Sequence, residues 1–236
     1  MAVQDAEVRD DPNAPARRDD HEGEGATRGT ARMEAFADAV FAIAFTLPVV
    51  EIHLPEAGKA GAHLGQELIA LWPSYAGYLL ASFVIGLYWV HHHFSGAIYR
   101  TTGHWFLLAT AVFLAAIGFI AFPARAFAEH MVDAAARPDA ARYWVLSLSV
   151  IACSWVFKWT IGWKRGQVDM RLEPDYITGL NRRYWLFALV NVVAAALVMV
   201  SWPAGLALSS AVTLCLLIPP MTPRYVTETP IVEGES

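Results

Sequence analysis

The sequence predicts an all-α fold: a polytopic membrane protein with six transmembrane helices. Hydrophobic residues make up 56% of the 236 positions and charged residues only 17%, whereas soluble domains usually carry about 25% charged residues. The apolar residues gather into runs close to the roughly 20 residues that a helix needs to cross a bilayer. These runs lack period-two alternation, and in hydrocarbon only helices and closed barrels satisfy the backbone. Helices are therefore favoured over strands.

Polarity divides the chain into three regions. Residues 1–31 contain Asp, Glu, Arg, Gly and Pro with almost no large apolar residue, so we predict a disordered cytoplasmic tail. This segment lacks the apolar core and cleavage site of a signal peptide. Residues 32–220 are predicted to form the six-helix transmembrane domain. Residues 221–236 are predicted to be a cytoplasmic C-terminal tail.

The six predicted helices run from Met33 to Ile52, Ile69 to Val90, Trp105 to Phe122, Tyr143 to Trp163, Tyr184 to Ser201 and Ala204 to Ile218. The last is short, and Pro219 and Pro220 end it, as prolines do after a helix C-terminus. Cys153 and Cys215 lie inside apolar runs without metal-ligand spacing. We expect both to be packing residues, so the cysteines do not indicate whether the chain lies in an oxidising or a reducing compartment.

Lys and Arg in the connections predict the orientation, because cytoplasmic loops carry an excess of these residues. With six helices, both tails and the second and fourth loops share one side. That side holds twelve of the 17 cations and the other side four. Both termini are therefore expected to be cytoplasmic, in a multi-pass protein of the cell membrane. The remaining cation, Lys158, lies inside the fourth helix, where we expect it to snorkel to the interface.

The first helix carries polar residues that suit a lipid-facing helix poorly. Asp38, Thr46 and Pro48 lie within its span, and Glu51 lies near its far end. A charge inside a membrane costs several kcal/mol and normally faces protein or water, so we expect this helix to be central and shielded by the others. Pro48 cannot donate to the carbonyl of Ala44 and should loosen the helix there.

At 100° per residue, one stripe of this helix is apolar except for a single hydroxyl. Its members are Ala39, Ile43, Thr46, Leu47 and Val50. Periodicity alone supports two interpretations. The stripe lines a pore, with Ile and Leu as a gate and Thr as an ion contact, or it packs against another helix in the ordinary way.

A histidine cluster ends the second helix. His91, His92 and His93 are consecutive, so they cannot all face one point, whereas a helical metal site needs two at i and i+4. One interpretation is that they mark the cytoplasmic interface and bond to the first helix, where one could pair with Asp38 or lie near Arg32. The other is that they ligate a metal or a haem. The sequence shows no paired carboxylates, no nucleophile–base pair and no phosphate-binding glycine loop, so nothing supports an enzyme. It also shows no basic face for nucleic acid.

Three motifs in the first 100 residues resemble one family. Arg32, Phe36 and Asp38 are similar to the R-x-x-x-F-S-D signature that opens helix one in the lysosomal potassium channel family, that of transmembrane protein 175 and its prokaryotic relatives. Residues 42–47 are similar to that family's pore helix. Trp89, His92 and His93 are similar to its W-x-x-H-H ending of helix two.

The resemblance implies a potassium-selective or potassium-preferring channel that assembles as a homotetramer in the lipid bilayer, with helix one lining the pore. It assigns the constriction to Ile43, a hydroxyl ring for ion selectivity to Thr46, and further apolar layers to Leu47 and Val50. It makes Arg32, Phe36 and Asp38 structural, tied to the histidines of helix two. It implies no metal site and no cofactor, with K⁺ only as the permeant ion.

Two departures from the family pattern affect these expectations. Ala37 stands where the signature has Ser, and Pro48 stands where the family commonly has Leu. The proline makes Val50 the least secure pore residue. Neutral hydroxyls replace only part of a hydration shell, so we expect modest selectivity for K⁺ over Na⁺.

Two other functions are compatible with the residues. A proton-coupled or small-solute transporter would use Asp38, Glu51 and the histidines, although transporters usually show matching broken helices in internal repeats, and Pro48 has no evident counterpart in helix four. A di-haem cytochrome would use His91 to His93 and would show a Soret band.

Overall fold

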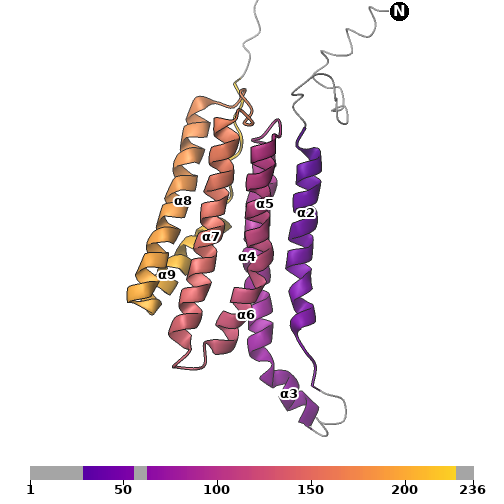
Figure 1. Cartoon of the computed structure of the whole chain (residues 1–236), viewed down its shortest axis with the longest axis vertical. Helices are drawn as coiled ribbons and strands as arrows, with labels where there is room; N and C mark the ends of the chain where they lie inside the picture. Colours follow the sequence, from indigo (N-terminus) through magenta and orange to yellow (C-terminus); the bar gives the residue numbers. More distant parts are fainter. Residues whose placement is uncertain (1–28, 56–62, 227–236) are drawn as a thin grey trace, which may run out of the picture.

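The chain folds into a bundle of helices that run alternately up and down (Figure 1). The computed structural model describes residues 29–55 and 63–226, so most of the predicted N-terminal tail and the last ten residues lie outside it. The helical elements are α2 (Ala31–Thr46), η1 (Leu47–Glu51), α3 (Leu64–Ala70), α4 (Trp72–Gly96), α5 (His104–Phe119), α6 (Ala121–His130), α7 (Arg137–Lys164), α8 (Pro174–Val200), α9 (Trp202–Leu214) and η3 (Cys215–Leu217).

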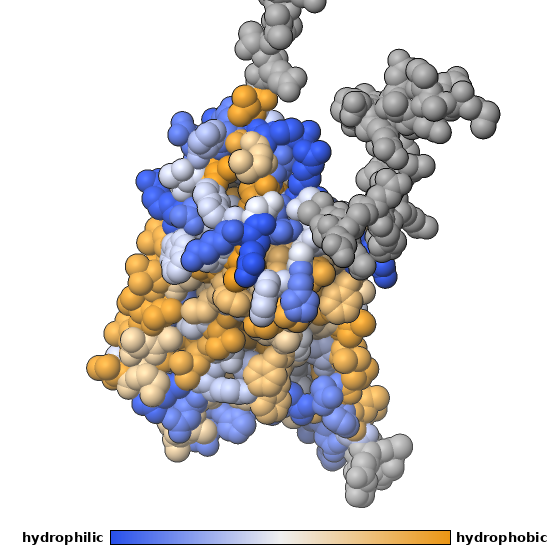
Figure 2. All heavy atoms as spheres, turned by 45° about the horizontal axis from the view of Figure 1, so that its top comes forward, coloured by the Kyte–Doolittle hydropathy of each residue, from blue (hydrophilic) through white to orange (hydrophobic). Residues whose placement is uncertain are grey.

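The predicted all-α, multi-pass membrane fold is confirmed. Five helical segments are long and apolar enough to cross a membrane: Ala31–Glu51, Trp72–Gly96, His104–His130, Arg137–Lys164 and Pro174–Val200. The sixth apolar segment, Trp202–Leu217, is shorter than the usual span, as the sequence indicates. An apolar band separates two hydrophilic ends of the molecule (Figure 2), which is the surface that a bilayer requires.

Prolines set helix boundaries that the hydropathy runs do not show. The predicted second helix begins at Ile69, but α3 ends at Ala70 and α4 begins at Trp72, because Pro73 cannot donate to the carbonyl of Ile69. Likewise α5 ends at Phe119 and α6 continues to His130, with Pro123 in the first turn of the new helix. The predicted third helix was therefore eight residues too short at its C-terminal end.

Several helices also extend past the apolar runs into polar sequence. The helix α4 continues to Gly96, α7 begins at Arg137 and α8 begins at Pro174. The turn between α8 and α9 is tight, and a Cβ atom at Gly205 would lie 2.4 Å from the Cα atom of Val198. Only glycine allows this approach.

The main core lies between α4, α5, α7 and α8, and α2 lies at the edge of the bundle (Figure 1). Side chains with almost no exposed surface fill this core, among them Ile85, Phe113, Leu148 and Ile151. The expectation that the first helix is central and shielded by the other five was wrong for the single chain. The two cysteines, predicted to be packing residues, are both exposed.

A second core closes one end of the bundle, where the described chain both enters and leaves (Figure 1). Tyr99, Phe106 and Trp159 form its centre, and a Cβ atom at Gly162 would lie only 2.8 Å from the Tyr99 ring. Residues 221–226 pack here, since Tyr176 Oη donates to the carbonyl of Met221 at 3.2 Å. Burial raises the pKa of Tyr99 well above its ordinary value.

An ion pair fixes the loop between α7 and α8 at this same end. Arg171 Nη2 lies 2.7 Å from Asp169 Oδ2, and the backbone N–H of Arg171 donates to Asp169 Oδ1 at 2.9 Å. The backbone N–H of Asp169 donates to the carbonyl of Ile98, which joins this loop to the one after α4. The hydrogen bonds from Arg171 hold the pKa of Asp169 below its ordinary value despite burial.

We expect Asp169→Asn to lower the melting temperature near neutral pH and to lose this effect in acid. A carboxyl with a lowered pKa in the folded state contributes stability above its unfolded pKa of about 4, and this is lost as pH falls through the folded pKa. The gap between parent and variant, measured in detergent solution, should therefore stay constant above about pH 5 and narrow as the pH falls below about 4. Asp175→Asn, at an exposed carboxylate, is the control. A gap that does not depend on pH would contradict this account.

Candidate functional site

One face of α2 packs against α4 and α5 while the opposite face is exposed. The buried residues, Met33, Ala37, Phe41 and Ala44, follow helical spacing and point into the bundle. The predicted pore stripe lies on the other side. Ile43 is 57% exposed, Leu47 58% and Val50 64%, and Thr46 is exposed as well. In a membrane protein, an apolar surface of this size is covered either by lipid or by another subunit.

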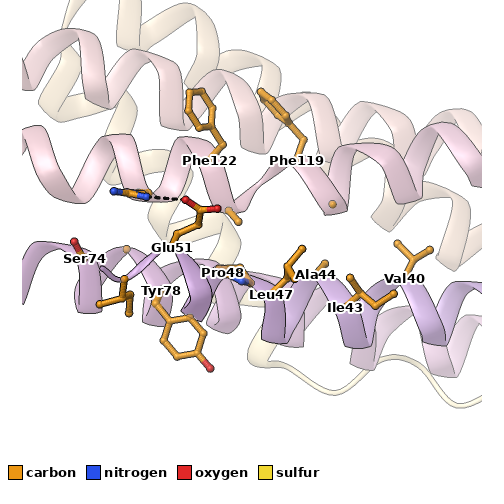
Figure 3. Close-up of a pocket in the computed structure, with 15 residues that line it drawn as sticks. Val40, Ile43, Ala44, Leu47, Pro48, Glu51, Ser74, Tyr78, Phe119 and Phe122 are labelled. Carbon is orange, nitrogen blue, oxygen red and sulfur yellow. Dashed lines mark hydrogen bonds and ion pairs between the residues drawn. The ribbon is translucent and has the colours of Figure 1, made fainter. Parts of the chain in front are cut away.

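Part of this stripe borders a groove of about 470 Å³ between α2, η1, α4 and the α5–α6 pair. Ile43 lines it from α2 and Leu47 from η1 (Figure 3), and Phe119 and Phe122 line it from α5 and α6. Thr46 and Val50 do not border the groove. The structure therefore divides the predicted stripe between a groove-facing part and a part that points further outward.

The polar end of the groove is an ion-pair chain that the sequence reasoning missed. Arg125 Nη1 lies 3.2 Å from Glu51 Oε2, and Arg125 Nε lies 2.7 Å from Glu129 Oε1. The i,i+4 spacing of Arg125 and Glu129 in an alanine-rich stretch is a helix signal, and it was available in the sequence. This signal predicts a longer third helix.

The hydroxyl of Thr46 is bonded within its own helix. Its Oγ1 donates to the carbonyl of Ala42 at 2.8 Å, with that of Ile43 at 3.4 Å. A hydroxyl carries one hydrogen and two lone pairs. Because the hydrogen is directed back along the helix, the lone pairs remain available to a cation outside it.

Pro48 changes the geometry below Thr46, as its missing N–H predicts. The α-helix ends at Thr46, and residues 47–51 form a 3₁₀-helix. In a 3₁₀-helix, side chains three residues apart eclipse one another. Val50 therefore lies over Leu47 rather than following the α-helical stripe, which is the shift that Pro48 predicts.

The sequence matches known proteins over this region. Residues 32–121 match the family model described as endosomal/lysosomal potassium channel TMEM175. The chain is 30% identical over 177 residues to a potassium channel of Streptomyces collinus, covering 75% of this chain and 85% of that relative. The chain belongs to the TMEM175 family.

Two further comparisons agree with this family. A potassium channel of Chamaesiphon minutus is 37% identical over 123 residues, which are 51% of this chain and 60% of that relative. The crystal structure of a lysosomal potassium-selective channel TMEM175 homolog from the same organism superimposes with a TM-score of 0.64 at 26% identity, covering 80% of this chain and 96% of that one. The TMEM175 match spans α2, α4 and α5, where the three sequence motifs lie.

The TMEM175 signature residues of α2 lie along its contacts with α4 and α5. Trp89 Nε1 donates to Asp38 Oδ1 at 3.1 Å, so the tryptophan of helix two, and not a histidine, bonds the acid. Arg32 and Phe36 border a shallow hollow with Leu107 of α5, and Phe36 is 59% exposed. The expected hydrogen bond between Asp38 and a histidine is replaced by the bond from Trp89.

The three histidines of α4 point to three different surroundings. His91 Nε2 lies 2.8 Å from the carbonyl of Leu216. His92 is buried and stacks on Phe113 at 5.8 Å between ring centroids, with Phe41 of α2 at 5.4 Å. His93 is exposed. Among the described residues there is no cluster of three or more His, Cys, Asp or Glu side chains that could hold a metal ion. His92 joins helix two to helix one through the Phe41 ring.

Lys158 lies in the core, and the expectation that it snorkels to the interface was wrong. It is 1% exposed, and its Nζ lies 4.5 Å from the ring centroid of Trp155, 5.3 Å from that of Phe113 and 5.6 Å from that of Tyr99. Within the described part of the chain no carboxylate pairs with it. Its cation–π contacts with these three rings offset part of the free-energy cost of burying it.

Proposed function

We propose that this chain is a potassium-preferring cation channel that assembles as a homotetramer, with α2 of each subunit lining a central pore. One observation carries the proposal: the predicted stripe of α2 is the exposed side of a helix at the edge of the bundle. A single edge helix cannot enclose a water-filled path. Several copies, arranged with these stripes facing a common axis, would enclose one and cover the apolar surface.

Within this arrangement Ile43 forms the narrow constriction, with Leu47 and Val50 as neighbouring apolar layers. A ring of such side chains loses its water when narrow and blocks ions, and a small dilation or rotation lets water in. The groove beside Ile43 and Leu47 gives α2 room to make such a movement against α5 and α6. To open the pore, Ile43 and Leu47 would move from the apolar constriction toward the apolar groove.

Thr46 supplies the contact for the ion. Its hydroxyl hydrogen is bonded inside the helix, so each subunit offers lone pairs and no fixed charge to the pore. A ring of neutral oxygens replaces part of the hydration shell of K⁺ and discriminates modestly against Na⁺. K⁺ is the permeant ion in this proposal, and no cofactor takes part.

The signature residues hold α2 in register rather than contact the ion. The Trp89–Asp38 bond and the ring contacts of His92 with Phe41 and Phe113 connect α2 to α4 and α5. Among the described residues, the cations that the sequence assigns to one side, such as Arg100, Lys164 and Arg171, lie at the end where the described chain enters and leaves. We propose that this end is cytoplasmic and that the protein resides in the cell membrane.

The experiment that tests this proposal measures ion selectivity in Thr46→Val, which keeps the side-chain shape and removes the hydroxyl. We expect the K⁺ over Na⁺ permeability ratio, taken from bi-ionic reversal potentials in proteoliposome-fused bilayers, to fall to about one, because neutral oxygen ligands set the preference. Thr46→Ser retains the oxygen and should keep the parent ratio. Saturating flux without ohmic single-channel currents would point to a transporter instead. An unchanged ratio in Thr46→Val would remove Thr46 from the ion path.

A further inference from the structure

A second cavity lies between α4, α7, α8 and the segment that follows α9, away from α2. It measures about 250 Å³. Tyr88 and Trp155 line it from α4 and α7, and Tyr184 and Phe187 line it from α8. The first two side chains are buried in the bundle core, so the interior surface of the cavity is aromatic and apolar.

One edge of this cavity is cationic. Arg183 of α8 borders it, and within residues 29–55 and 63–226 Arg183 makes no hydrogen bond or ion pair. His91 borders it as well, and its Nε2 bonds the carbonyl of Leu216. An exposed guanidinium beside an apolar cavity is a ready partner for an anion, because it presents a planar fork of donors to a phosphate.

Another edge of the cavity is apolar and exposed. Cys215 and Ile218 border it, and Ile218 is 62% exposed. Cys215 lies near the end of the sixth apolar segment and Ile218 directly follows it, so both belong to the surface that faces hydrocarbon. The cavity thus opens where an apolar surface meets a cation, at the end of the bundle proposed to be cytoplasmic.

We propose that this cavity binds one anionic membrane phospholipid, with part of an acyl chain against the aromatic side chains and the phosphate at Arg183. Charge complementarity selects this occupant, since the rim offers the guanidinium of Arg183 and the cavity interior offers apolar rings. Basic pockets between transmembrane helices on the cytoplasmic side are suited to anionic lipid head groups. The bound chain would join α8 to the segment after α9 and to the end of α4.

This binding site is independent of ion conduction, so its test uses no flux. In a Cys153→Ser background Cys215 is the only thiol of the chain, and it reports the occupancy of the cavity. Purified full-length protein in a neutral detergent is titrated with dioctanoyl phosphatidylglycerol or dioctanoyl phosphatidylcholine. The rate of Cys215 alkylation by an uncharged maleimide is then measured at each lipid fraction.

We expect half-protection of Cys215 at a phosphatidylglycerol fraction about tenfold lower than for phosphatidylcholine, a ratio that corresponds to about 1.4 kcal/mol. Arg183→Gln should abolish this preference. Arg182→Gln is the matched control, because Arg182 is the adjacent exposed arginine and does not border the cavity. It should leave the preference intact.

Three results would overturn the site. The two lipids could protect the parent equally, which would leave no role for the anionic head group. Arg182→Gln and Arg183→Gln could reduce the preference alike, which would indicate general surface charge. Cys215 could be unreactive in delipidated protein, which would show that the cavity is covered by something other than a lipid.

Discussion

Replacing Ile43 by asparagine is expected to raise potassium efflux from proteoliposomes by about tenfold or more, the change that follows from lowering a conduction barrier by about 1.4 kcal/mol. In the proposed tetramer, four isoleucine side chains around the axis would exclude water, and the barrier would be the cost of moving an ion through a dry gap. An amide at the same position binds water and keeps the gap wet. The measurement is the initial rate of K⁺ release, normalised to the amount of protein incorporated.

Ile43→Val is the control for this substitution, because it removes one methylene and remains apolar. It should keep efflux near the parent rate. Val49→Asn, on an exposed residue of η1 that borders neither the groove nor the proposed pore stripe, controls for adding an amide to this end of α2. If the Ile43→Asn variant conducts no faster than Ile43→Val, the constriction lies elsewhere. A loss of folded protein in Ile43→Asn alone would indicate that Ile43 packs in a dry interface.

The membrane-spanning helices could be predicted because each is marked by a long run of apolar residues in the sequence. A run of apolar residues must be helical in hydrocarbon whatever its neighbours are. The ends of the helices could not be predicted in the same way, because they depend on donors rather than on hydropathy. Pro73 and Pro123 break hydrogen bonds to carbonyls three to four residues earlier, and the polar extension of α7 to Arg137 follows from packing beyond the apolar run.

The features of the candidate site that depend on the first helix alone could be predicted from the sequence. The angular separation of Asp38 from Ile43 follows from 100° per residue, and the loss of α-helical hydrogen bonding follows from Pro48. Which helix bonds Asp38, and that Ile43 borders a groove with Phe119, depends on how α4 and α5 are rotated against α2. The rotation of one helix against another is set by how their side chains pack together. The sequence pattern of a single helix does not contain this information.

Lys158 shows the same limit most clearly, because a lysine near the end of an apolar run ordinarily reaches the interface. Here the position faces Phe113 and Trp155, and the side chain has no exposed path outward. The desolvation of one buried cation costs several kcal/mol, whereas a cation–π contact returns about 0.5 to 2 kcal/mol. Three rings therefore offset only part of the cost.

We expect Lys158→Met to stabilise the protein by about 2 kcal/mol, since replacing buried charge with an apolar side chain of similar size is often stabilising. Methionine keeps the length of the chain among the rings and removes the ammonium group. The measurement is the melting temperature or denaturation midpoint in detergent. Lys164→Met, on the same helix but exposed, should change neither.

The sign of this effect decides between two views of the buried cation. A stabilised variant would mean that the ammonium is retained at a cost in stability, as intramembrane ionisable residues usually are when they have a functional role. In that case the place to look for the role is the neighbouring aromatic layer, because Phe113, which contacts Lys158, also stacks on His92 and packs on Phe41 of α2. A destabilised variant would mean that the three rings and His92 form a site in which the cation itself holds α5 and α7 together.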